Sequence, residues 1–69
     1  MQFVILSTLS KVSKSGKPYS QAACKGTSKS GSSFFFLATI PDDLLDHDGE
    51  LLDRNVVFND HGNAFVLPY

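Results

Sequence analysis

The residues best suited to bind a charged ligand lie in one short segment, Ser13-Lys14-Ser15-Gly16-Lys17-Pro18-Tyr19-Ser20. Its ammonium groups can bind phosphates, and the Tyr19 ring is a flat surface on which a nucleobase can stack. Gly16 can adopt positive φ, so the segment favours a turn. The same tetrapeptide returns as Ser28-Lys29-Ser30-Gly31. We therefore expect two basic turns at the tips of β-hairpins, in a pattern typical of nucleic-acid binding.

Strand-forming runs flank both turns and continue to the end of the chain. The predicted strands are residues 2–12, 19–27, 34–40, 53–58 and 64–68, and none of them shows a helical period. One helical turn is expected at 42–46, where acidic residues follow Pro41. This order predicts a single all-β domain over residues 1–69, a small five-stranded antiparallel Greek-key barrel of the OB type. An SH3-like barrel is the alternative architecture.

The third predicted strand indicates which side chains face the core. Successive side chains of a strand point to opposite faces, so its residues divide into two sets. The even positions are uniformly apolar and are expected in the core: Phe34, Phe36, Ala38 and Ile40. Phe35 must then point outward, either as a second stacking surface or as part of a protein interface.

Charge is segregated along the chain, although the net charge is only −1. Residues 1–40 contain five lysines and no acid (+5), whereas residues 41–69 contain seven acids and Arg54 (−6). The lysines are Lys11, Lys14, Lys17, Lys25 and Lys29. We interpret them as a track for phosphates; the alternative is that they only keep the hairpin tips soluble. Three or four phosphate contacts would give a log–log salt slope of about −2 to −3.

The remaining polar residues do not form a pattern that predicts catalysis or metal binding. The serines and the two histidines form no specific set of nucleophile, base and orienting group. The run Asp46-His47-Asp48-Gly49-Glu50 lacks the spacing of a calcium loop. Cys24, the only cysteine, is expected to be a small buried hydrophobe. We therefore expect neither an enzyme nor a cofactor, and no small-molecule substrate.

Chain length and the first residues lead to expectations about assembly and location. A chain of 69 residues buries only about 60% of its unfolded surface, so its stability is marginal. Oligomerisation, here a homodimer, is the expected source of further stability. The apolar run at the start turns polar at Ser7, which is too short for a signal peptide or a membrane span. A cytoplasmic protein without a membrane partner is expected.

The segment at residues 13–20, with Cys24 in the next strand, resembles the filamentous-phage single-stranded-DNA-binding proteins. These helix-destabilising proteins coat replicating phage genomes. Their first hairpin carries a basic residue followed by Gly-Lys-Pro-Tyr-Ser, and their last strand ends in Val-Leu-Pro, as Val66-Leu67-Pro68 does here. The resemblance implies an OB-like barrel, a two-fold homodimer and cooperative, largely sequence-independent binding to single-stranded DNA. Apart from the resemblance, RNA is the alternative ligand.

The resemblance also assigns roles to individual residues. Lys14 takes the place of a loop arginine that contacts DNA, Lys17 that of the loop lysine, and Tyr19 that of the aromatic residue after proline. Family members are longer and carry basic and aromatic residues in the second half, where this chain is acidic. The predicted nucleic-acid-binding residues are Lys14, Lys17, Tyr19, Lys25, Lys29 and Phe35. The alternative function is a protein-interaction module whose acidic half docks a partner, with DNA binding lost.

Overall fold

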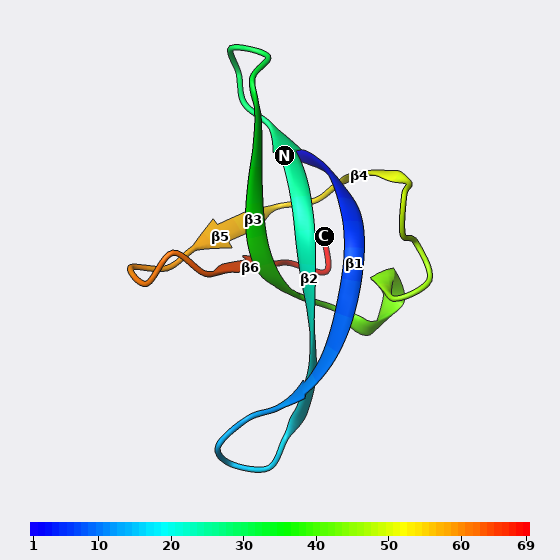
Figure 1. The fold of residues 1–69 in the computed structure, drawn as a ribbon, viewed down its shortest axis with the longest axis vertical. Coiled ribbons are helices and arrows are strands. Elements are labelled where there is room, and N and C mark those ends of the chain that lie inside the picture. The colour runs from blue at the N-terminus through cyan, green and yellow to red at the C-terminus, as the bar shows by residue number, and fades with distance from the viewer.

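The computed structural model describes all 69 residues and shows one curled sheet of six strands (Figure 1). The strands are β1 (Gln2–Val12), β2 (Pro18–Thr27), β3 (Ser33–Ile40), β4 (Leu51–Asp53), β5 (Val56–Phe58) and β6 (Ala64–Val66). A 3₁₀ turn, η1 (Asp42–Leu44), lies between β3 and β4. The predicted all-β class and the single helical turn after Pro41 are therefore confirmed.

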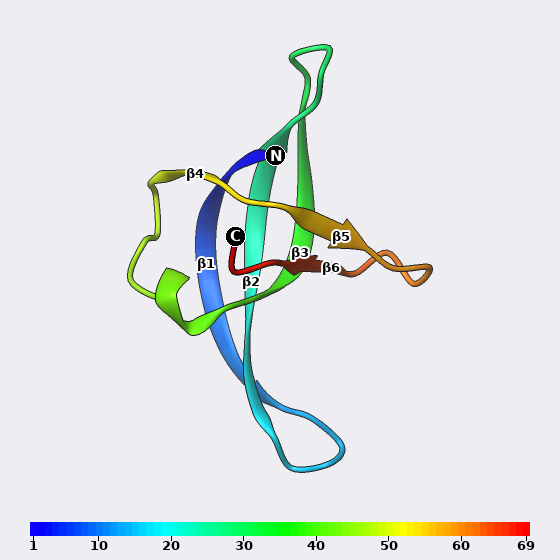
Figure 2. The same cartoon turned by 180° about the vertical axis from the view of Figure 1, so that it is seen from behind.

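The strand order explains why the sheet is curled. The order is β4-β1-β2-β3-β6-β5, so β4 and β5 form opposite edges. Only Arg54 and Asn55 separate these two strands in the chain, and three residue steps span at most about 11 Å. The long β1-β2-β3 meander must therefore bend until its two edges approach each other. The result is a half-barrel whose concave side encloses the core (Figures 1 and 2).

The predicted strand count and pairing need correction. The run 53–58, predicted as one strand, divides into β4, which pairs with β1, and β5, which pairs with β6. Its two parts lie at opposite edges of the sheet, so there are six strands and not five. The wholly antiparallel barrel is also wrong, because β6 runs parallel to β3. The last strand ends at Val66 rather than at residue 68.

The core lies where the alternation in the third strand placed it. Phe36, Ala38 and Ile40 are buried, and Phe34 packs partly buried against them. Leu44 of η1 is also fully buried, so the 3₁₀ turn contributes to the same core. The other buried apolar residues come from β1, β2 and β6: Phe3, Ile5, Ala22, Cys24, Ala64 and Val66. The expectation that even positions of β3 face inward is confirmed.

Strand β2 contributes two small buried residues to the inner face of the sheet, Cys24 and Gly26. Cys24 is fully buried, and burial raises the pKa of its thiol to about 11. The thiol therefore stays protonated at neutral pH, in agreement with its prediction as a small hydrophobe. A Cβ at Gly26 would lie 2.9 Å from Met1 Cε and 3.0 Å from Phe34 Cζ. Glycine at this position is what allows the Phe34 ring to lie against β2.

The acidic second half is held by a hydrogen bond to β1 and by the contacts of Arg54. Gly49 N donates to Ile5 O at 2.9 Å, which places the loop between η1 and β4 beside β1. Arg54 donates to a carboxylate oxygen of Asp43 at 2.5 Å and to Leu67 O at 3.4 Å. The hydrogen bond from Arg54 lowers the pKa of Asp43. The only arginine of the chain therefore joins η1, the β4–β5 break and the last residues.

No helix here is long and apolar enough to cross a bilayer.

Candidate nucleic-acid interface

Strand β2 presents a row of side chains on the convex face of the sheet. Because alternate residues of a strand share a face, its odd positions point away from the core, and only its even positions are buried: Ser20, Ala22, Cys24 and Gly26. Lys11 lies opposite Tyr19 in β1–β2, and Lys25 lies opposite Phe35 in β2–β3. Directly opposite side chains stand about 5 Å apart on one face. The register thus creates two basic–aromatic pairs on the same surface.

The two pairs are separated along β2. Tyr19 and Lys25 are six residues apart, which corresponds to about 20 Å of strand. Phe35 is 73% exposed, the most exposed aromatic side chain of the protein, and Tyr19 is half-buried. The predicted outward orientation of Phe35 is confirmed. A ligand that contacts both pairs must be extended and must follow the direction of β2.

The repeated Ser-Lys-Ser-Gly tetrapeptide forms the same turn twice. In the first turn, Ser13 Oγ accepts from Lys17 N at 3.2 Å, and Ser13 O accepts from Gly16 N at 2.9 Å. In the second, Ser28 plays the same part toward Ser32 N, at 3.2 Å, and Gly31 N, at 3.0 Å. Both glycines have positive φ, 83° and 86°. The serines and glycines build the turns, so Lys14 and Lys29 extend from equivalent positions.

The two turns lie at opposite ends of the molecule (Figures 1 and 2). The longest extent of the protein is 39 Å, and the β1–β2 and β2–β3 hairpin tips mark its two ends. Lys14 and Lys17 are therefore far from Lys29, and the lysines do not form one compact cluster. The outer face of β2, with Lys25 on it, is the surface that connects the two ends.

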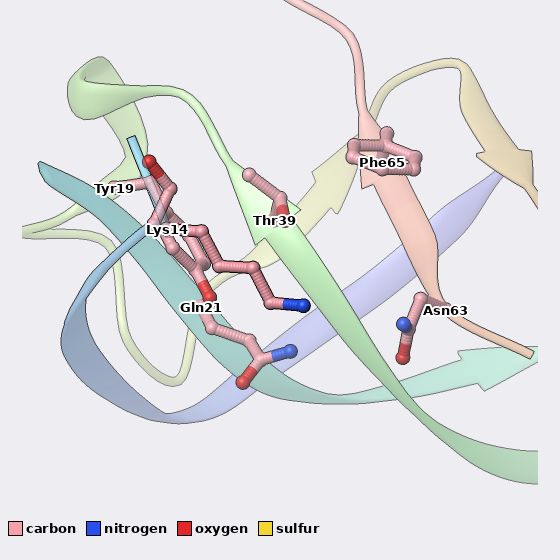
Figure 3. A pocket seen from close by; sticks show the side chains of 7 residues that line it. Lys14, Tyr19, Gln21, Thr39, Asn63 and Phe65 are labelled. Carbon is pink, nitrogen blue, oxygen red and sulfur yellow. The ribbon is translucent and has the colours of Figure 1, made fainter. Parts of the chain in front are cut away.

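A pocket of about 420 Å³ lies on this convex surface beside Tyr19 (Figure 3). Residues from the β1–β2 turn, β2, β3 and the β5–β6 hairpin line it: Ser13, Lys14, Tyr19, Gln21, Thr39, Asn63 and Phe65. The Lys14 ammonium and the Gln21 amide point toward the middle of the pocket, and Asn63 and Phe65 stand on its other side (Figure 3). The pocket therefore combines two aromatic rings with several hydrogen-bonding groups.

A second pocket, of about 340 Å³, continues this surface toward the other basic–aromatic pair. It is mostly apolar and is lined by Ala23, Cys24, Phe35, Phe36, Leu37, Gly62 and Asn63. Asn63 lines both pockets, so the β5–β6 hairpin lies beside the pocket at Tyr19 and the pocket at Phe35. We call these two neighbouring pockets together the β2–β3 groove. No carboxylate lines either pocket.

Four lining residues of the first pocket were not predicted from the sequence: Gln21, Thr39, Asn63 and Phe65. Phe65 reaches the groove because β6 pairs in parallel with β3, which places Phe65 beside Thr39. Strand alternation is consistent with its outward orientation, because its neighbours Ala64 and Val66 are both buried and successive side chains of a strand point to opposite faces. Nothing in the local sequence indicates which strand β6 joins.

Comparisons of the chain with models of known protein families, with curated proteins and with solved structures gave no significant match.

Proposed function

We propose that this protein binds single-stranded DNA, without enzymatic activity, along the β2–β3 groove. The observation that carries the proposal is the register that sets Lys11 beside Tyr19 and Lys25 beside Phe35 on one exposed face. Lysines bind phosphates without reading sequence, and aromatic rings stack on any base. Binding is therefore largely independent of sequence, like that of the filamentous-phage proteins that the first hairpin resembles.

We further propose that the half-barrel is an OB-type barrel. If β4 and β5 are counted as one strand broken at Arg54-Asn55, five strands remain, and the broken strand contacts both the first strand and the last. A partly open five-stranded Greek-key barrel has this arrangement. OB barrels bind oligonucleotides mainly on the face of their second and third strands. The equivalent strands here, β2 and β3, carry the groove.

Binding of wild-type protein to a labelled oligothymidine at several salt concentrations tests the proposed function. We expect affinity to fall with salt with a log–log slope of about −2 to −3, because three or four lysine–phosphate contacts each contribute about −0.7. Fluorescence anisotropy provides the isotherms. If no binding occurs even at low salt, the proposal fails, and the alternative of an interaction module with a docking acidic second half takes its place.

We also propose that the protein acts as a cytoplasmic homodimer, with the contact on the β1–β4 side of the sheet. Leu6 and Leu51 are 50% and 67% exposed there, away from the β2–β3 groove. Only 12 of 69 residues are buried within one chain, so covering these leucines adds substantially to a small core. Sedimentation velocity at micromolar concentration should show a dimer, and Leu51→Lys should shift it to a monomer. A wild-type monomer would contradict this assembly.

A further inference from the structure

The first pocket of the groove is lined by the ammonium group of Lys14 together with polar groups that can hydrogen-bond to a base. The Lys14 ammonium points into the pocket, next to the Gln21 amide and between the Tyr19 and Phe65 sides (Figure 3). At about 420 Å³, the pocket is in the size range of small-ligand sites. Its aromatic rings can stack on a base, while its polar groups reach the edge of that base. A phosphate alone would use the ammonium but not the two rings.

The hydrogen-bonding capacity of these groups is unequal. Gln21 and Asn63 each carry a donor and an acceptor, so their amides can adapt to any base edge. Lys14 carries three donors and no acceptor. Guanine presents the O6 acceptor, and thymine and uracil present O4, where adenine and cytosine present an amino donor instead. An ammonium strengthens a hydrogen bond to such a carbonyl, and it is opposed to an amino group at the same position.

We propose that this pocket holds one unstacked nucleobase and selects keto bases (guanine, thymine and uracil) over the amino bases adenine and cytosine. The inference rests on the proposed function, because it concerns a base delivered by a bound single strand. It adds a modest preference at one position to binding that is otherwise independent of sequence. Lys14 is the discriminating group, and the rings of Tyr19 and Phe65 hold the base.

Oligodeoxyuridine and oligodeoxycytidine, each about 12 nucleotides long to match an OB-type site, test the inference. Their bases differ at the 4-position and in the hydrogen on N3, and their backbones are identical. At pH 7.5 the wild-type protein should bind the uridine oligomer about tenfold more tightly. Lys14→Ala should weaken binding to both and bring the ratio of affinities close to one. Lys14→Arg, which keeps the charge and the donors, should preserve the preference.

Lys17→Ala is the matched control, because Lys17 lies in the same turn but does not line the pocket. It should weaken binding to both oligomers equally and leave the ratio unchanged. A wild-type ratio of one would overturn base selection, and a preference that survives in Lys14→Ala would overturn Lys14 as the discriminating group. Both results would leave single-strand binding intact. Absence of binding to either oligomer would instead overturn the proposed function and this inference with it.

Discussion

Replacing Tyr19 and Phe35 together by alanine is expected to reduce affinity for oligothymidine by about 2 to 6 kcal/mol, without changing the salt slope. Each ring that stacks on a base contributes about 1 to 3 kcal/mol. The two rings are near the ends of the β2–β3 groove, about 20 Å apart along the strand, so their contributions should add. Stacking releases no counterions, and the dependence on salt should therefore stay the same. Anisotropy titrations of both single variants and the double variant measure these losses.

Tyr69→Ala provides the control for this prediction. Tyr69 is 71% exposed, similar to Phe35, but lies at the end of the chain and lines neither pocket. Its backbone carbonyl accepts from Asn55, a contact that the substitution preserves. Affinity should be unchanged in this variant. If the double variant loses no more affinity than Tyr69→Ala, the aromatic rings are not stacking surfaces, and Phe35 belongs to a protein contact.

Local patterns in the sequence were sufficient to predict much of the groove. The uniformly apolar even positions of β3 placed Phe36, Ala38 and Ile40 in the core and Phe35 outside, because strand alternation depends only on neighbouring residues. The two Ser-Lys-Ser-Gly turns were equally readable, since a serine acceptor and a glycine with positive φ define them locally. The first three strands follow one another as hairpins, so their order also required no distant information.

The second half of the chain could not be predicted in the same way. The break at Arg54-Asn55 depends on two different pairing partners, β1 and β6, which the local residue pattern does not contain. The parallel pairing of β6 with β3 joins residues 26 positions apart, Ala38 and Ala64. That pairing brings Phe65 and Asn63 to the first pocket. Of the four unpredicted lining residues, Asn63 and Phe65 therefore depend on non-local pairing, whereas Gln21 and Thr39 lie in the hairpin strands β2 and β3.

Replacing Lys14 and Lys17 by alanine is expected to make the salt slope for oligothymidine shallower by about 1.4. The Lys14 ammonium has three donors, so it can bind a phosphate as well as the base carbonyl proposed above. Each lysine that neutralises a phosphate of a single strand contributes about 0.7 to the slope. Relative to binding at 1 M salt, a change of 1.4 corresponds to about a 25-fold loss of affinity at 0.1 M. Both residues are exposed and lie in a hairpin turn, so the fold should be unaffected. Isotherms at four or more salt concentrations give the slope.

Lys29→Ala tests whether the lysines form a linear track for phosphates or only keep the hairpin tips soluble. Lys29 occupies the equivalent position in the turn at the opposite end of the 39 Å molecule. A strand of about four nucleotides, the lower limit for an OB-type site, cannot reach both ends if it binds beside Tyr19. Lys29→Ala should therefore leave binding of this short oligomer unchanged and weaken binding of one of about 16 nucleotides. If the Lys14 and Lys17 replacements leave the slope unchanged at both lengths, the lysines do not contact phosphates, and the single-strand interface lies elsewhere on the protein.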